Sequence, residues 1–162
     1  MDPKLRRAYS RCVTEVARGL LPDLVNGYYD YLVIDLASIT YGVRDPRSFL
    51  VNIRLAIDYG YLEPRVIFVL DYSRPEHRGV AGSRIKWLRD LGLEYVLAED
   101  GPAEVKAARL CLEKPRCIVL SRDYDPLTII NEMLQPIKVS ERAWVLRKIA
   151  INRDCLAKHG IP

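Results

Sequence analysis

The chain has 162 residues, of which 25 are Lys or Arg and 21 are Asp or Glu, so its formal net charge is +4. This length suits one compact domain, and a content of 49% hydrophobic and 28% charged residues argues against a disordered chain. Charged residues or prolines interrupt every apolar run before the roughly 18 residues that a membrane span needs, and no signal peptide is recognisable. We therefore expect one domain, without a membrane segment, in the cytoplasm.

Two further features of the composition bear on the source and the partners of the protein. Eighteen of the basic residues are Arg and Gln135 is the one Gln, which is compatible with a thermophilic source. The four cysteines show no CxxC pair and no zinc-site spacing, so we expect buried thiols. A Cys111–Cys117 bridge stays open if the source is a hyperthermophile. The small positive charge is compatible with a nucleic-acid partner.

The elements predicted along the chain begin with an amphipathic helix over residues 3–21, with Leu5 and Val13 on its apolar side and arginines opposite. Strands and helices then alternate. The strands are expected at 29–37, 65–71, 93–100 and 116–125, and the helices at 46–61, 83–92 and 102–114. Because a helix separates each pair of strands, the connections are crossovers and the sheet is parallel.

The last part of the chain gives weaker patterns. Residues 127–134 look helical, 136–140 fit a short fifth strand, 143–151 are ambiguous between strand and helix, and 151–160 fit a terminal helix. We therefore predict a three-layer α/β/α fold with a mainly parallel sheet of about five strands. We expect one domain over 1–162, with an N-terminal helical extension at 1–27, a core at 30–130 and C-terminal elements at 131–162.

Acidic residues follow the predicted strands, where parallel sheets gather their ligands. The candidates are Asp35, Asp71, Glu104, Asp123 and Asp125. A single acid at such a position is most often a helix cap or a solvated loop charge, and we keep Glu99 and Asp100 only as secondary candidates. Five acids at one edge of a sheet would repel one another, and Mg²⁺ or Mn²⁺ relieves such repulsion because these ions prefer carboxylate oxygens.

Four segments in this order resemble the nuclease core of the flap endonuclease group, within the PIN-like superfamily. The segments are YLVIDLASITYGVR, FVLDYSRPEHR, LGLEYVLAEDGPAEVKAA and CIVLSRDYDPL, and together they extend over roughly residues 30–130. The resemblance implies that the five acids bind two metal ions, which activate a water and stabilise the leaving oxygen of a phosphodiester. It also implies basic residues at the nucleic acid, for which the candidates are Arg78, Arg84, Lys86 and Lys106.

The chain also departs from this family pattern. Lys106 stands where the family has a second Glu, and its ammonium would take the place of one metal ion. The last acidic ligand of the family is missing unless Asp154 replaces it, and the helix–turn–helix module for duplex DNA is absent. The segment from Asp71 to Trp87 is too short for a helical arch, and a helix precedes the first strand. We therefore expect single-stranded RNA or DNA as the partner rather than a flap duplex.

Two classes of function stay open. The first is a Mg²⁺- or Mn²⁺-dependent nuclease, and the second is a PIN-like scaffold that has lost catalysis and binds nucleic acid or a partner protein. A homodimer also stays open. A Toprim domain ranks lower because it needs a Glu where Asp35 stands. A Ser-His hydrolase is poorly supported because the chain has no GxSxG motif.

Overall fold

The chain folds into one central sheet with helices on both faces. The structure is a computed structural model that describes residues 1–139 and 144–162. The strands are β1 Val13–Gly19, β2 Tyr31–Asp35, β3 Arg65–Asp71, β4 Glu94–Ala98, β5 Cys117–Leu120, β6 Glu132–Val139 and β7 Trp144–Ile151. The helices are α1 Pro3–Cys12, α2 Leu21–Val25, α3 Leu36–Thr40, α4 Pro46–Asp58, α5 Pro75–Asp90, α6 Ala103–Leu112 and α7 Arg153–Lys158, with a 3-10 turn η1 at Asp125–Thr128.

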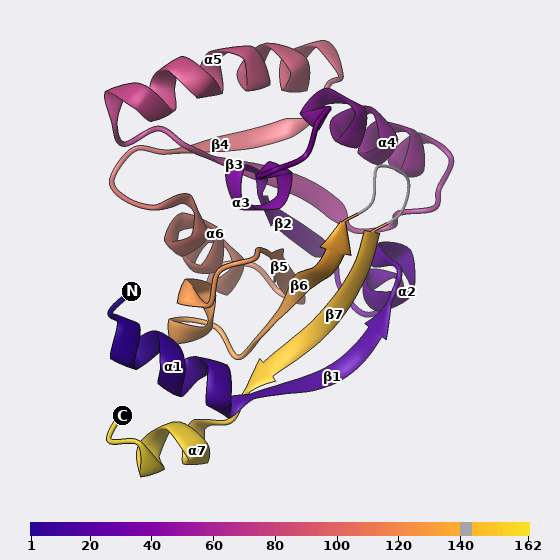
Figure 1. Cartoon of the computed structure of the whole chain (residues 1–162). Helices are drawn as coiled ribbons and strands as arrows, with labels where there is room; N and C mark the ends of the chain where they lie inside the picture. Colours follow the sequence, from indigo (N-terminus) through magenta and orange to yellow (C-terminus); the bar gives the residue numbers. More distant parts are fainter. Residues whose placement is uncertain (140–143) are drawn as a thin grey trace.

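The sheet orders its strands β1-β7-β6-β5-β2-β3-β4 (Figure 1). The five neighbouring strands from β6 to β4 are parallel, whereas β7 is antiparallel to both β6 and β1. The predicted α/β class with a mainly parallel sheet is therefore confirmed. The sheet has seven strands within the described ranges rather than about five, because β1 and β7 extend it.

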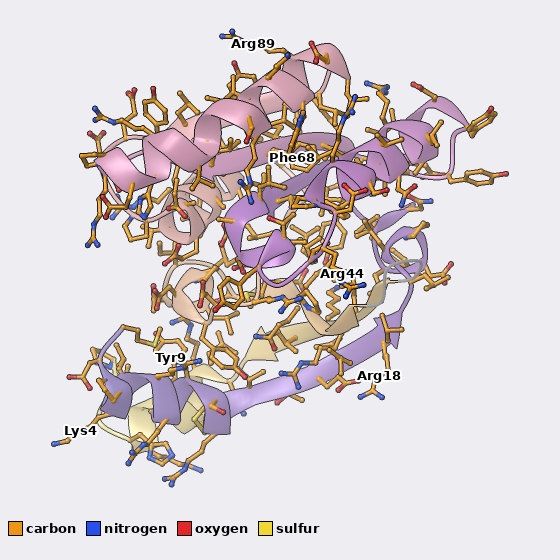
Figure 2. All side chains as sticks on the ribbon, turned by 45° about the horizontal axis from the view of Figure 1, so that its top comes forward. Lys4, Tyr9, Arg18, Arg44, Phe68 and Arg89 are labelled. Carbon is orange, nitrogen blue, oxygen red and sulfur yellow. A yellow bond between two sulfur atoms is a disulfide. The ribbon has the colours of Figure 1, made fainter. Side chains whose placement is uncertain are left out.

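Alternation along the strands explains the three layers. In β2, Leu32 and Ile34 belong to one core cluster and Val33 to the other, because successive side chains of a strand point to opposite faces. The first cluster is covered by α2, α3, α4 and α5, and the second by α1, α6, η1 and α7. Phe68, at the middle of β3, is fully buried in the first cluster (Figure 2).

The predicted helix over 3–21 is wrong in its second half. Asp2 caps α1, which ends at Cys12, and Val13–Gly19 forms β1. This strand pairs antiparallel with β7, more than a hundred residues later in the chain. The residues of β1 are almost all exposed, so no alternation of apolar and polar residues marks them as a strand. The expected extension at 1–27 is thus helical only in part.

The predicted helix over 127–134 is also wrong, because η1 ends at Thr128 and β6 begins at Glu132. The short strand expected at 136–140 falls within β6, and the ambiguous segment 143–151 is the strand β7. The ends of these two segments, Ser140 and Ala143, lie outside the described residues. The terminal helix expected at 151–160 is present as α7.

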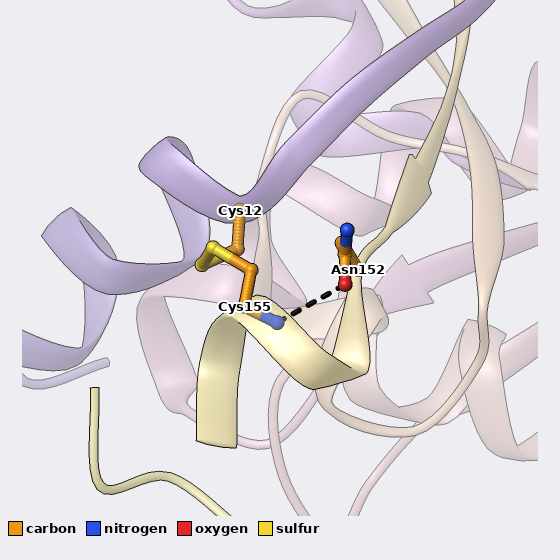
Figure 3. The surroundings of a disulfide bond; sticks show 3 residues. All are labelled: Cys12, Asn152 and Cys155. Carbon is orange, nitrogen blue, oxygen red and sulfur yellow. Dashed lines mark hydrogen bonds between the residues drawn. A yellow bond between two sulfur atoms is a disulfide. The ribbon is translucent and has the colours of Figure 1, made fainter. Parts of the chain in front are cut away.

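The four cysteines, all within the described ranges, form two disulfides instead of the expected buried thiols. Cys111–Cys117 is the bridge that the sequence left open, and Cys12–Cys155 joins α1 to α7 (Figure 3). Beside the second bridge, the Asn152 side chain accepts a hydrogen bond from the Cys155 amide at 3.0 Å. Among the described helices, none is long and apolar enough to cross a membrane.

Candidate metal centre

Three of the predicted acids come together at the carboxyl ends of the parallel strands. Asp35 is the last residue of β2, Glu104 lies in the first turn of α6, and Asp123 follows β5. One carboxylate oxygen of each lies within 4.8 Å of the others. The sheet produces this arrangement because β5, β2, β3 and β4 are parallel neighbours, so the loops after them meet at one edge.

Asp35 is the most buried member of the group, with 1% of its surface exposed. Its Oδ2 accepts a hydrogen bond from the Ser121 hydroxyl at 3.1 Å, and its Oδ1 accepts one from the Ser38 amide at 3.5 Å. Burial raises the pKa of Asp35 to about 8, and the negative charges of Glu104 and Asp71 contribute to the rise, against the opposing effect of the Ser121 hydrogen bond. The site therefore holds a carboxyl group that resists ionisation until a cation joins it.

The carboxyl groups of Glu104 and Asp123 also have raised pKa values. Burial raises the pKa of Glu104 to about 7, and repulsion from Asp123 and Asp71 contributes to the rise. Asp123 lies at the exposed side of the group, where partial desolvation and the charge of Asp125 raise its pKa. The positive charge of Arg6 acts in the opposite direction on Asp123.

The two remaining acids of the predicted set lie beside this group. Asp71 ends β3, and its Oδ1 accepts a hydrogen bond from the Ala103 amide at 2.8 Å, which fixes the start of α6 against the sheet. Asp125 begins η1. The charges of both raise the pKa of Glu104, so both lie within electrostatic reach of that carboxyl group.

The donor set of this centre consists of carboxylates alone. Such a set fits a hard divalent cation, because Mg²⁺ and Mn²⁺ prefer oxygen ligands and tolerate several waters in their coordination shell. The raised pKa values of Asp35 and Glu104 support the fit, since a bound cation would favour the ionised form of both. Asp35, Glu104 and Asp123 are the residues that could hold the ion directly.

The predicted basic residues differ in their surroundings. Arg84 is half-buried and lines a cavity of about 390 Å³ together with Asp71 and His77. Arg78 is exposed, donates from Nε to the Tyr72 carbonyl at 3.2 Å, and lies over the Tyr72 ring. Arg84 is therefore the basic candidate that shares a cavity with an acid of the centre.

Lys86 and Lys106 are both exposed. Lys106 follows Glu104 by two residues in α6, and residues at this spacing do not face each other on a helix. The geometry therefore does not direct the ammonium of Lys106 toward the carboxylates. Asp154, in α7, is exposed, as are Glu99 and Asp100 after β4.

Sequence reasoning missed three contributors to the centre. Ser38 and Ser121 hydrogen-bond to Asp35, and the Ser38 hydroxyl also accepts from the Arg122 amide at 2.7 Å. Arg6 comes from α1, which is remote in sequence from the acids. The two serines stand inside the quoted segments and could have been considered, whereas the position of Arg6 depends on the pairing of β1 with β7.

Comparison with solved structures identifies the fold. A crystal structure of human GEN1 in complex with Holliday junction DNA matches with a TM-score of 0.66 at 14% identity, over 99% of this chain and 46% of that chain. A structure of the Holliday junction-resolving enzyme GEN1 with product DNA and Mg²⁺ matches with a TM-score of 0.62 at 20% identity, over 87% and 38%. The catalytic core of Rad2 matches with a TM-score of 0.51 at 15% identity, over 94% and 51%.

No protein-family model matches the sequence, and no curated protein matches it significantly. The chain spans about half or less of the solved chains that it resembles. The match to human GEN1 includes nearly the whole chain, so the N-terminal helix belongs to the matched region, contrary to the expected departure. The chain therefore shares the fold of these GEN1 and Rad2 structures, in line with the resemblance of its sequence segments to the flap endonuclease group.

Proposed function

We propose that the chain is a divalent-metal-dependent nuclease that hydrolyses phosphodiester bonds in RNA or DNA. The observation that carries the proposal is the meeting of Asp35, Glu104 and Asp123 within 4.8 Å, at the edge of the sheet where such folds bind ligands. The likeness to GEN1 and Rad2 supports it, since one of these structures contains Mg²⁺ and product DNA.

Each residue of the centre has a role in this proposal. Asp35, Glu104 and Asp123 would hold Mg²⁺ or Mn²⁺, and Asp71 and Asp125 would complete the acidic surroundings. When bound, such ions lower the pKa of an attacking water and stabilise the leaving oxygen of the phosphodiester. The basic residues that would contact the nucleic acid are Arg78, Arg84, Lys86 and Lys106.

Arg84 has the most defined place among these basic residues. It lines the cavity of about 390 Å³ beside Asp71, and burial lowers the pKa of its guanidinium. Its Nε lacks a hydrogen-bond partner within the described chain. A phosphate in that cavity would pair with the charge of the Arg84 guanidinium and would lie next to Asp71, so Arg84 would orient the phosphodiester toward the acids.

We propose a single-stranded substrate rather than a flap duplex. Helix α5 begins at Pro75, four residues after Asp71, and runs without a break to Asp90. This connection is too short to form an arch around a flap. The domain that carries the activity would be the whole of residues 1–162.

The test is cleavage of end-labelled single-stranded RNA, single-stranded DNA and a flap duplex with Mn²⁺. Wild type should cleave a single strand, and Asp123→Asn should lower the rate by about 100-fold or more, because it removes a carboxylate ligand. Asp90→Asn is the matched control, since Asp90 is an exposed acid at the end of α5 and is outside the candidate set. Equal residual cleavage by wild type and Asp123→Asn would refute the metal-nuclease proposal.

Two observations favour a second candidate, a PIN-like scaffold without catalysis. Lys106 occupies a position where the family resemblance implies an acid, and Asp154 is exposed on α7. Fewer acidic ligands would weaken a two-metal centre. This candidate predicts that wild type binds a nucleic acid or a partner protein but cleaves none of the three substrates.

A further inference from the structure

A second charged surface lies outside the metal centre, on α1. A groove of about 530 Å³ runs between this helix and the C-terminal segment. Its lining residues from α1 are Lys4, Leu5, Arg7, Ala8 and Arg11. Asp2, His159 and Ile161 complete the groove, which we call the α1 groove. The mechanism proposed above uses none of these residues.

The α1 groove is strongly positive. Lys4, Arg7 and Arg11 follow one another at helical spacings of three and four residues, so they form one stripe along α1. All three are exposed, and no ion pair joins them to an acid within residues 1–139 and 144–162. Figure 2 shows Lys4 pointing away from the body of the protein, whereas Tyr9 lies on the inner side of the helix.

The one acid of the α1 groove is already engaged. Asp2 is the N-cap of α1, and its Oδ1 accepts hydrogen bonds from the Lys4 amide at 2.7 Å and the Leu5 amide at 3.4 Å. This carboxylate therefore stabilises the helix end and does not pair with the basic stripe. The net charge that the groove presents to a ligand is positive.

The walls of the α1 groove are fixed in place. Ala8, Tyr9 and Cys12 are buried in the same core cluster as Leu156 of α7. The Cys12–Cys155 disulfide joins the two helices covalently (Figure 3). A ligand would therefore meet a largely preformed surface, which lowers the entropic cost of binding.

The other side of the same helix approaches the metal centre. Ala8 and Tyr9 of α1 share a buried core cluster with Leu127 of η1, the turn that begins at Asp125. Figure 1 shows α1 between η1, which follows Asp123, and α7. A chain of phosphates that leaves the metal centre past Arg6 would next reach the stripe of Lys4, Arg7 and Arg11.

We propose that the α1 groove binds the phosphate backbone of single-stranded nucleic acid next to the cleavage site. The proposal rests on the proposed function. Lys4 and Arg11 are about 10 Å apart along the helix axis, from a rise of about 1.5 Å per residue. This length suits a few successive phosphates of one strand, and Leu5, Ala8 and Ile161 offer apolar contacts for sugars or bases.

The test measures binding of a labelled single strand by fluorescence anisotropy, in EDTA so that no cleavage occurs. The strand has about 20 nucleotides, which is longer than the site sizes of single-strand binders. Arg7→Ala/Arg11→Ala should weaken binding about tenfold at low salt. It should also lower the slope of log K against log salt by about 1.4, because each phosphate that an arginine neutralises contributes about 0.7. The matched control is Arg47→Ala/Arg89→Ala, which removes two exposed arginines from α4 and α5 on the opposite face of the sheet. The control should bind as wild type does.

The outcomes separate this inference from the proposed function. If Arg7→Ala/Arg11→Ala has the affinity and the salt slope of wild type, the α1 groove does not bind the strand and the inference is refuted, even if the protein cleaves nucleic acid. A blunt duplex bound as tightly as the single strand, with the same weakening in the variant, would overturn its preference for one strand. Weaker binding by the variant supports nucleic-acid binding in the α1 groove, whether or not wild type cleaves a substrate. Absence of cleavage by wild type would refute only the proposed nuclease activity. A melting temperature equal to that of wild type would show that the variant is folded.

Discussion

Replacement of the buried carboxyl at the metal centre should stabilise the protein when no metal is present. In Asp35→Asn, the neutral amide has the size of the carboxyl group and can still accept from the Ser121 hydroxyl. The pKa of Asp35 rises from 3.8 to about 8 on folding, so the folded state keeps a proton that the unfolded chain releases. The contribution of Asp35 to stability is therefore fully present below about pH 4 and is lost as the pH rises toward 8.

The size of the effect follows from this shift. At pH 7 the solution is about three units above the pKa of the unfolded carboxyl, and each unit corresponds to about 1.36 kcal/mol, which gives a ceiling of about 4 kcal/mol. Relaxation of the neighbouring acids lowers this value, so we expect Asp35→Asn to add about 2–4 kcal/mol to the free energy of unfolding. For a chain of this length the melting temperature should rise by roughly 5–15 °C.

Thermal unfolding in EDTA, followed by circular dichroism at about pH 5 and about pH 8, measures the effect. Wild type should melt at a lower temperature at the higher pH, and Asp35→Asn should reduce this difference. Added Mg²⁺ should raise the melting temperature of wild type more than that of the variant, because only wild type keeps all the ligands. Asp90→Asn, at an exposed site at the end of α5, should behave as wild type. A variant that melts below wild type in EDTA at the higher pH would refute the reasoning.

Further substitutions test the hydrogen bond to Asp35 and the two disulfides. Ser121→Ala removes a hydrogen bond that lowers the pKa of Asp35, so Mn²⁺ titration at about pH 7 should show a midpoint several-fold higher than in wild type. Cys12→Ser should cost up to about 5 kcal/mol and Cys111→Ser about 2 kcal/mol in denaturant unfolding, from the chain entropy of the loops that the disulfides close. The order follows from sequence separations of 143 and 6 residues, and equal destabilisation by both changes would contradict it.

The central part of the fold was predictable because its patterns are local. The apolar runs at Leu32–Ile34 and Val66–Leu70 are buried on both faces, as expected for parallel strands covered by helices. The acids at the ends of these strands follow directly from that assignment, since parallel strands direct their carboxyl ends to one edge. The meeting of Asp35, Glu104 and Asp123 at one edge of the sheet could therefore be inferred before its geometry was known.

The outer strands were not predictable in this way. β1 is exposed on both faces, and its apolar residues do not alternate with polar ones as they do in a half-buried strand. The spacing of Val13, Val16 and Leu20 instead fits a helix, which explains the wrong prediction. In β6, Met133, Leu134 and Gln135 are all buried, and a short buried run does not distinguish a strand from a helix. Pairing with distant strands decides both cases, and one sequence does not reveal such pairing.

This distant pairing also determines what lies next to the acids. β1 pairs with β7 and β7 with β6, so the two ends of the chain meet at one side of the sheet. Because α1 precedes β1 directly, the same pairing sets α1 against η1 and α7 and brings Arg6 near Asp123. The charge of +4 is thus unevenly placed, with carboxylates at the strand ends and a basic stripe on the helix beside them. A polyanion that approaches this edge meets attraction from α1 that offsets repulsion from the acids, even before a metal ion neutralises them.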